Sequence, residues 1–205
     1  MTTSSMERRA ARVKAAHDIE NLLCRYSYYL TAGDTETILN MFAQREDVSV
    51  SLSSMGQWTG TEGLKRFCAF LLAARGDGIG QLEIHLVTNL VIEVSEDCSR
   101  ANAVLVSPGV STGAPEGDHL SSGWDWARAE VELINEDGTW KFLHVGIYDL
   151  FYAPYGHTFV GYSKPAPAVP AEFVPDTART LDCAYTPDGV QRLLPVPPVP
   201  DRKIG

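Results

Sequence analysis

The sequence changes its periodicity once, at the glycine-rich stretch RGDGIG (residues 75–80). Before this stretch, apolar residues recur every three or four positions, which is typical of helices with one buried face. After it, apolar and polar residues alternate in successive runs, which is typical of strands. The helices therefore precede most of the sheet, and this order predicts an α+β fold rather than alternating strands and helices.

Two helices joined by a tight corner are predicted near the N-terminus. Apolar residues between Met6 and Ala32 form one stripe, and Gly33 fits the C-terminal cap of that helix. Asp34 fits the N-cap of the next helix, residues 35–42, because its side chain can accept a hydrogen bond from the first turn. The chain is therefore expected to turn back sharply after the first helix.

A strand, a third helix and four longer strands follow. VSVSLSS (residues 48–54) alternates like a strand with one apolar face, GQWTG is predicted as a turn, and Thr61 fits the cap of a helix over residues 61–74. Turn sequences separate the later strands, so we expect a curved antiparallel sheet. These later strand-like runs cover residues 82–94, 100–110, 124–134 and 140–150.

The end of the chain differs from the rest in composition. Nine of the twelve prolines lie between Ser163 and Gly205, with almost no periodic apolar pattern. We therefore divide the chain into one folded domain, residues 1–162, and a proline-rich C-terminal extension, residues 163–205. The extension is expected either to lie along its own domain or a partner subunit, or to be disordered.

Charge and composition exclude several classes of function. The net charge is −9 and basic residues cluster only in the N-terminal ERRAARVK, which argues against nucleic-acid binding. No apolar run reaches the roughly 18 residues that cross a bilayer, and no signal peptide is evident, so we expect a cytoplasmic protein without membrane contact. The four cysteines and five histidines form no C-x-x-C or H-x-x-x-H pair, which predicts free thiols and no metal site.

The order of elements, together with the motifs RYSYYLTAGD, GTEGL, H-x-x-x-N-x-x-I-E-V and DGTWKF, resembles the SnoaL-like branch of the NTF2-like superfamily. This branch includes scytalone dehydratase and polyketide cyclases. The resemblance covers roughly Asp18 to Tyr152 and implies a cone, in which helices cover a strongly bent sheet around an apolar pocket. It also implies action on a small molecule without a cofactor, and homodimers or homotrimers formed through the sheet.

The resemblance carries over only part of the dehydratase site. His85 falls at the position of a catalytic histidine and Tyr26 at the position of a pocket aromatic. The aspartate that orients the histidine is missing, so the machinery for removal of water is not reproduced intact. Four polar positions of the dehydratase, two tyrosines, this aspartate and a second histidine, are occupied here by Leu30, Thr31, Leu52 and Gly109.

Four polar residues are the main candidates, and each has an alternative role. His85 is either a proton carrier that titrates near neutrality or a hydrogen-bonded core histidine. Asp125 either replaces the missing partner of His85 or is a strand-end carboxylate in water. Tyr26 either holds a substrate oxygen or bonds a backbone carbonyl. Thr31 either supplies a hydroxyl group or packs the end of the first helix.

Strand alternation assigns further side chains to the pocket. It places His85, Val87 and Asn89 on one face, and it places His144 and Phe142 on the face of the last strand that points away from the pocket. The predicted substrate contacts are Leu30, Thr31, Leu52, Asn89, Ala129, Val145, Ile147, Asp149 and Tyr152.

Exposed aromatic residues gather near the end of the domain. Tyr152, Tyr155, His157 and Phe159 are predicted to form either a lid that excludes water or a subunit interface. Trp124 and Trp126 point to the opposite face of their strand, where the resemblance favours subunit packing.

Three hypotheses for the function result. The first is a cofactor-independent lyase or isomerase, of dehydratase, cyclase or carbon-carbon lyase type, that acts on a small apolar aromatic molecule. In it His85 moves a proton, Asp125 or Asp149 assists, and Tyr26 holds an oxygen. The second is a non-catalytic binding or assembly module that resembles the small subunit of ring-hydroxylating dioxygenases. The third is proton transfer like that of steroid isomerases, with Asp125 as the base.

Overall fold

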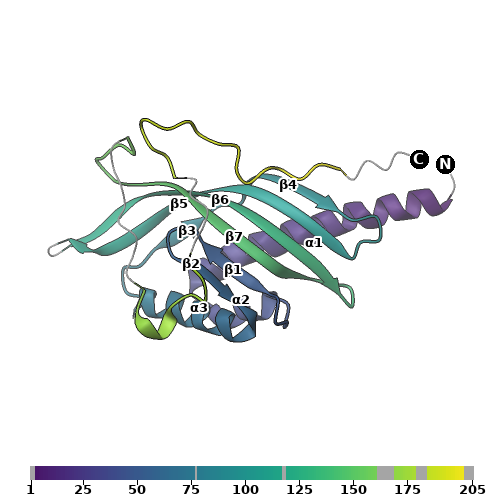
Figure 1. The fold of residues 1–205 in the computed structure, drawn as a ribbon, viewed down its shortest axis with the longest axis horizontal. Coiled ribbons are helices and arrows are strands. Elements are labelled where there is room, and N and C mark those ends of the chain that lie inside the picture. Colours follow the sequence, from purple (N-terminus) through teal and green to yellow (C-terminus); the bar gives the residue numbers. More distant parts are fainter. Residues whose placement is uncertain (1–2, 77, 117–118, 161–168, 179–183, 201–205) are drawn as a thin grey trace.

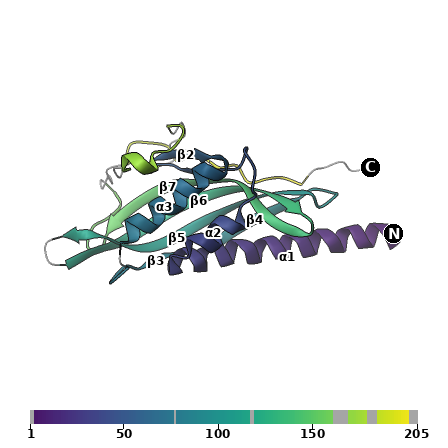
Figure 2. The same ribbon diagram turned by 90° about the horizontal axis from the view of Figure 1, so that it is seen from below.

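The computed structural model describes residues 3–76, 78–116, 119–160, 169–178 and 184–200. Within these residues the protein forms three α-helices and a bent seven-stranded sheet. The helices cover one face of the sheet, which confirms the α+β prediction (Figure 1 and Figure 2). The helices are α1 (Thr3–Ala32), α2 (Thr35–Met41) and α3 (Gly60–Arg75), with a 3-10 helix η1 (Ala171–Phe173). The strands are β1 (Ser49–Leu52), β2 (Gly56–Thr59), β3 (Glu83–His85), β4 (Thr88–Val94), β5 (Arg100–Glu116), β6 (His119–Glu136) and β7 (Thr139–Pro154).

The sheet is mixed, whereas the sequence predicted an antiparallel one. Its order is β2-β1-β7-β6-β5-β3, and β4 also pairs with β5. The long strands β5, β6 and β7 are antiparallel neighbours, but β1 runs parallel to β7, with Ser49 opposite His144. The alternation of apolar residues within a strand carries no information on the direction of a distant partner. The parallel pair was therefore missed.

The segment GQWTG, predicted as a turn, contains the whole of β2. This strand pairs with β1 from Leu52 opposite Gly56 to Ser49 opposite Thr59. The turn lies just before it, where the N–H of Met55 donates to the carbonyl of Leu52 at 3.1 Å. Trp58 lies in the middle of β2 and is fully buried. Burial of this indole holds the segment in the sheet and overrides the turn character of its two glycines.

The predicted strand over residues 82–94 is divided into β3 and β4. Both strands pair with β5, but the register shifts between Thr88 and Val91. Asn89 lies in this bulge with a φ of 48° and is exposed. A bulge reverses the alternation of side chains beyond it. The prediction that Asn89 shares the inward face of His85 is therefore wrong.

Backbone capping fixes the corner between α1 and α2, as predicted. The N–H groups of Gly33 and Asp34 donate to the carbonyls of Leu30 and Tyr29, both at 3.0 Å. This pair of bonds is a Schellman motif, and Gly33 has the positive φ, 71°, that the motif requires. The carboxylate of Asp34 then accepts the N–H of Thr37 at 3.0 Å and caps α2.

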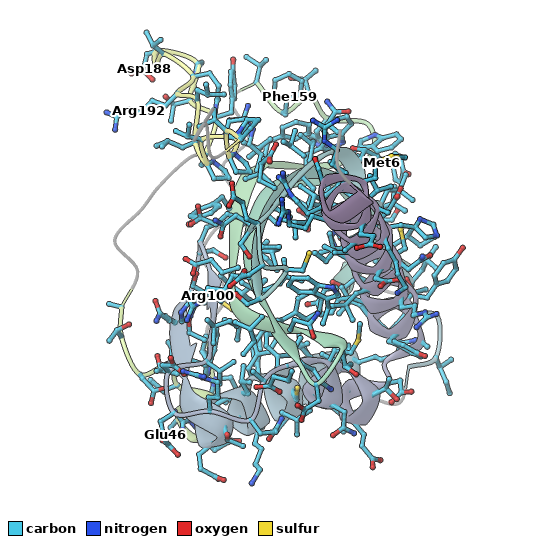
Figure 3. The ribbon with its side chains drawn as sticks, turned by 90° about the vertical axis from the view of Figure 1, so that its right-hand side faces the viewer. Met6, Glu46, Arg100, Phe159, Asp188 and Arg192 are labelled. Atoms are coloured by element: carbon cyan, nitrogen blue, oxygen red, sulfur yellow. The ribbon has the colours of Figure 1, made fainter. Side chains whose placement is uncertain are left out.

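One hydrophobic core joins the helices to the sheet, and Figure 3 shows side chains filling the space between α1 and the strands. Each fully buried large apolar side chain stabilises the fold by about 1.5–3 kcal/mol relative to an exposed one. The largest fully buried side chains of the core are Trp58, Phe42, Phe67, Phe142, Ile19, Ile38 and Leu64.

None of the helices in the described residues is long and apolar enough to span a membrane.

Residues 169–178 of the C-terminal extension lie against β2 and α3. The indole N–H of Trp58 donates to the carbonyl of Phe173 at 2.8 Å. The carboxylate of Asp176 accepts the N–H of Thr59 at 2.8 Å and pairs with the guanidinium of Arg66. The extension is thus attached to its own domain by both backbone and side-chain contacts.

A second described part of the extension, residues 184–200, crosses the sheet (Figure 1). The N–H of Tyr185 donates to the carbonyl of Leu150 at 2.7 Å. Farther on, one guanidinium nitrogen of Arg128 donates to the carbonyls of Arg192 and Leu194 at 3.1 and 2.9 Å. The extension therefore contacts β6 and β7 as well as the helical side.

We predict that Gly33→Ala destabilises the protein more than Gly138→Ala. Both glycines have positive φ, so each substitution costs about 1–2 kcal/mol in backbone strain. A Cβ at position 33 would also lie 2.9 Å from Cδ and Nε of Arg75, whereas nothing lies within 4 Å of one at position 138. Urea unfolding of both variants measures the difference. Equal losses would show that Arg75 does not constrain the corner.

Candidate active site

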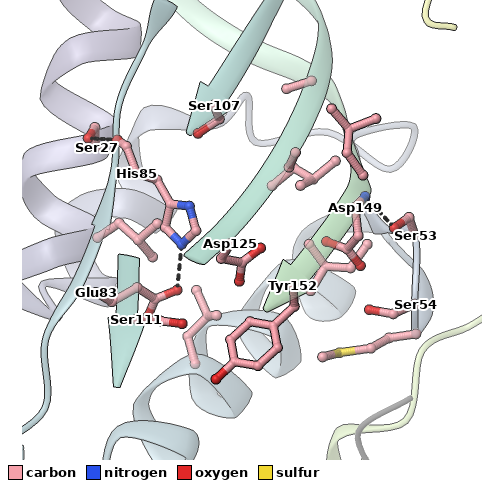
Figure 4. Close-up of a pocket in the computed structure, with 18 of the residues that line it drawn as sticks. Ser27, Ser53, Ser54, Glu83, His85, Ser107, Ser111, Asp125, Asp149 and Tyr152 are labelled. Carbon is pink, nitrogen blue, oxygen red and sulfur yellow. Dashed lines mark hydrogen bonds and ion pairs between the residues drawn. The ribbon is translucent and has the colours of Figure 1, made fainter. Parts of the chain in front are cut away.

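A cavity of about 1070 Å³ lies between the sheet and the helices. Its wall is mostly apolar, and a few polar side chains point into it from β3, β6 and β7 (Figure 4). A concave apolar site with a few converging polar groups is typical of small-molecule binding. Ten of the twelve residues predicted for the site line this cavity: Tyr26, Leu30, Leu52, His85, Asp125, Ala129, Val145, Ile147, Asp149 and Tyr152.

His85 and Glu83 form an imidazole-carboxylate pair within the cavity. Nε2 of His85 lies 3.1 Å from Oε1 of Glu83, and both side chains line the wall. The two residues are adjacent positions on the same face of β3, since strand side chains alternate. The hydroxyl of Ser27 on α1 donates to the backbone carbonyl of His85 and ties the strand to the helix.

Glu83 was not among the predicted site residues, although the sequence contains a signal for it. The alternation that placed His85 inward extends two residues back to Glu83. Asp125 was the carboxylate predicted as the possible partner of His85, whereas the carboxylate 3.1 Å from Nε2 of His85 is that of Glu83. Asp125 acts on the ring through its charge. The imidazole therefore has a carboxylate partner from its own strand.

Nearby carboxylates raise the pKa of His85. Burial alone would lower this pKa, because desolvation disfavours the imidazolium form. The hydrogen bond to Glu83 and the negative charges of Glu83, Asp125 and Asp149 act in the opposite direction and prevail. The pKa of His85 therefore lies above its ordinary value of 6.5, which favours the imidazolium form of the ring.

Gly109 leaves the space that the His85 ring occupies. The two residues are opposite each other in the pairing of β3 with β5. A Cβ at position 109 would lie 2.6 Å from Nδ1 of His85 and 2.8 Å from the carbonyl of Ile84. Contacts this short cannot form, so a side chain at this position would displace the imidazole.

Asp125 and Asp149 enter the same cavity from neighbouring strands. Asp149 stands opposite Ala127 in the pairing of β6 with β7, and Asp125 lies two residues from Ala127 on the same face of β6. The backbone N–H of Asp149 donates to the hydroxyl of Ser53 at 2.7 Å, which fixes this end of β7. Figure 4 shows both carboxylates on the side of the cavity that faces His85.

Tyr26 lies on α1 at the inner end of the cavity. Its ring packs edge-on against Phe142, with centroids 5.7 Å apart. Burial raises the pKa of the Tyr26 phenol far above its usual range, and the nearby carboxylate of Glu83 adds to this effect. Among the described residues the Tyr26 hydroxyl has no hydrogen-bond partner. The alternative prediction, a hydrogen bond from this hydroxyl to a backbone carbonyl, is therefore not observed.

Two predicted substrate contacts lie outside the cavity. Thr31 turns back along α1, where its hydroxyl donates to the carbonyl of Ser27 at 3.1 Å. It therefore packs the helix end, which was the alternative role considered for it. Asn89 is exposed in the bulge of β4.

A second bulge changes the inward face of β7. The register shifts where β7 passes Glu132 and Leu133 of β6, and Phe142 lines the cavity instead of facing away as predicted. His144 stays outside the cavity, where its Nδ1 lies 3.0 Å from the hydroxyl of Ser49.

A metal site is not found in the part of the chain that the structure describes, where no three His, Cys, Asp or Glu side chains converge suitably. Within the same part, Cys24, Cys68 and Cys98 are free thiols. Cys183 lies outside the described residues.

Sequence comparison places this chain in a known family, because the profile of the SnoaL-like domain matches residues 11–146. The chain belongs to the SnoaL-like family. The resemblance inferred from the sequence motifs is thereby confirmed. No curated protein sequence matches this SnoaL-like protein significantly.

Solved structures agree with the fold of this SnoaL-like protein. One, provisionally assigned as a scytalone dehydratase from Novosphingobium aromaticivorans, is 23% identical, with a TM-score of 0.56 and 74% of this chain and 97% of the other covered. The hexachlorocyclohexane dehydrochlorinase LinA-type3 from Novosphingobium barchaimii is 19% identical, with a TM-score of 0.56 and coverage of 73% and 97%. An NTF2-like protein with a cystatin-like fold from Novosphingobium aromaticivorans is 14% identical, with a TM-score of 0.56 and coverage of 71% and 88%. These likenesses establish the NTF2-like fold.

Residues beyond the matched SnoaL-like region complete the mouth of the cavity. Phe159 stacks on Phe151 with centroids 4.5 Å apart and meets Tyr185 edge-on at 5.1 Å. All three line the cavity, whereas Tyr155 and His157, also predicted for a lid, are exposed and do not. No sequence signal pointed to Tyr185, because the extension lacks a periodic pattern.

We predict that Glu83→Gln lowers the pKa of His85, since the substitution removes both the charge and the charge-assisted hydrogen bond. NMR titration of the imidazole protons measures this pKa. Glu62→Gln is the matched control, because Glu62 is exposed on α3 and pairs with Lys65 outside the cavity. An unchanged pKa in Glu83→Gln would contradict the assignment of Glu83 as the partner.

The same pair predicts a pH dependence of stability. The folded-state pKa of His85 is raised, so its contribution is fully present below the unfolded-state value, near 6.5, and is lost as pH rises through the folded-state pKa. Urea unfolding across this window should show the wild type losing stability with pH more steeply than Glu83→Gln does. Parallel curves for the two proteins would contradict the raised pKa.

Proposed function

We propose that this SnoaL-like protein is a cofactor-independent lyase or isomerase that acts on a small, largely apolar, aromatic molecule by general acid-base chemistry. The observation that carries the proposal is the His85–Glu83 pair inside a mostly apolar cavity. Proton transfer by a positioned side chain is most effective when its pKa lies near the working pH. Histidine is the side chain whose ordinary pKa lies closest to neutral pH, and the nearby carboxylates raise the pKa of His85 above that value.

His85 has the role of proton carrier in this proposal. Its Nε2 faces Glu83, and this carboxylate stabilises the imidazolium formed when the ring removes a proton from the substrate. The same ring then returns the proton to a leaving group or to another carbon atom. Asp125 and Asp149 assist by favouring the charged ring, which is their effect on the pKa.

Tyr26 has the role of hydrogen-bond donor to a substrate oxygen. Its raised pKa keeps the phenol protonated at every physiological pH, so it can donate but not act as a base. A donor aimed at the atom where negative charge develops stabilises an enolate or oxyanion in the transition state. The cavity wall around it is apolar, which strengthens such a bond by excluding water.

Two structural neighbours support an elimination in particular. The names of both describe the loss of a small molecule, water from a scytalone dehydratase substrate and hydrogen chloride from a dehydrochlorinase substrate. Both reactions need proton abstraction beside a leaving group in a dry site.

We predict that His85→Ala abolishes turnover, which a panel of phenolic and polyketide-like compounds followed by mass spectrometry would detect in the wild type. The expected loss in kcat is about a hundredfold to ten-thousandfold. His17→Ala is the control, because His17 is exposed on α1. Ligand binding without turnover, unchanged by His85→Ala, would instead favour a non-catalytic binding module.

We predict that Tyr185→Ala weakens substrate binding, since it removes part of the aromatic wall at the mouth. KM should rise several-fold with a smaller change in kcat, because the loss affects binding in the ground state and the transition state alike. Tyr155→Ala is the matched control, since Tyr155 packs on Trp124 outside the cavity. Equal effects of the two substitutions would exclude a binding role for the extension.

A further inference from the structure

Acidic side chains exceed basic ones on the wall of the cavity. Glu83, Asp125 and Asp149 contribute three carboxylates. Against them stand the imidazole of His85, which pairs with Glu83, and the guanidinium of Arg75, which donates to the backbone carbonyl of Thr31 at 2.9 Å. A cavity with this balance repels an anionic ligand and attracts a cationic one.

Asp125 and Asp149 concentrate this negative charge in one place. They lie on the same face of adjacent antiparallel strands, near the shared register position of Ala127 and Asp149. In the pairing of β6 with β7, Asp125 stands opposite Tyr152 and Asp149 stands opposite Ala127. Both carboxylates favour the charged form of His85, so their negative charge acts within the cavity.

Aromatic rings surround the space in front of these carboxylates. Tyr152 lies beside Asp125 and Asp149 in Figure 4, and its backbone stands opposite Asp125 in the sheet. Phe151, Phe159 and Tyr185 form the adjoining wall. Aromatic faces attract organic cations, and combined with carboxylates they form the usual recognition site for an ammonium group.

The geometry points to an organic cation as the ligand rather than a metal ion. A bound metal needs several converging ligands, and the described residues contain no group of three or more His, Cys, Asp or Glu side chains that could hold one. An alkylammonium group needs only one or two carboxylates and an aromatic face, while its carbon skeleton fills the apolar part of the cavity.

We infer that the cavity takes a substrate with a protonated amine, whose ammonium group lies between Asp125 and Asp149 and whose apolar body lies against the aromatic wall. This inference deepens the proposed function, on which it rests for the catalytic use of the same cavity. It places the amine apart from the His85–Glu83 pair, which remains available for proton transfer.

Binding of three molecules of matched shape tests the inference without turnover. Benzylamine, benzyl alcohol and benzoate differ mainly in charge at neutral pH. Calorimetry or ligand-observed NMR on the full chain should give benzylamine a Kd about tenfold or more below that of the alcohol, and benzoate the weakest binding. Competition should show that benzylamine and benzyl alcohol occupy the same site.

Substitutions assign the selectivity to the two carboxylates. Asp125→Asn and Asp149→Asn should each reduce the ratio between amine and alcohol affinities, and the double variant should bring it close to one. Glu96→Gln removes the same charge from an exposed turn outside the cavity and should leave the ratio unchanged. Circular dichroism shows whether each variant keeps its fold.

Three results would overturn the inference: no binding of benzylamine at millimolar concentration, equal affinity for amine and alcohol, or selectivity that survives the double substitution. None of these results affects the proposed proton transfer, which depends on His85 and is tested by turnover. Conversely, amine-selective binding with no turnover of any amine or neutral compound would support the inferred ligand class but contradict the proposed enzymatic function.

Discussion

Burial of the apolar faces of α1, α2 and α3 against the bent sheet is the packing interaction on which the rest of the molecule depends. The helices bury their large side chains at the end where Trp58, Phe42 and Phe142 lie. Along the inner face of β6 the side chains are small, as at Ala127 and Ala129, so the helices cover this face without filling it. The cavity is therefore the volume that remains between a large apolar cluster and a strand face with little side-chain bulk.

The polar groups in the cavity belong to one electrostatic unit. Glu83 satisfies Nε2 of His85, and the more distant carboxylates favour the charged ring over the neutral one. Tyr26 lies in the same wall, but its phenol remains protonated because of its burial. The cavity wall thus holds an imidazole whose pKa is raised by neighbouring carboxylates and a phenol whose pKa is raised by burial.

The features of the structure that depend on interactions between neighbouring residues could be predicted from the sequence. The change of periodicity gave the order of elements, and the caps at Gly33 and Asp34 gave the corner, because both depend on neighbouring residues. The inward face of β6 was also predicted correctly near Asp125, because Asp125, Ala127 and Ala129 all line the cavity although the register with β7 shifts between Trp126 and Ala127. The bulge at Asn89 could not be foreseen, since it depends on pairing with β5. The same holds for the parallel pairing of β1 with β7 and for the contribution of Tyr185, which come from residues far apart in the chain.

The glycine opposite His85 also limits how this site can change over generations. A histidine on the neighbouring strand, as in the dehydratase pattern, would need a Cβ where the His85 ring now lies. A histidine at position 109 would therefore fit only after His85 had adopted another rotamer or one of the two strands had moved. The effect of a substitution at position 109 therefore depends on the side chain at position 85, and a second histidine cannot stand opposite His85 while its ring keeps this orientation.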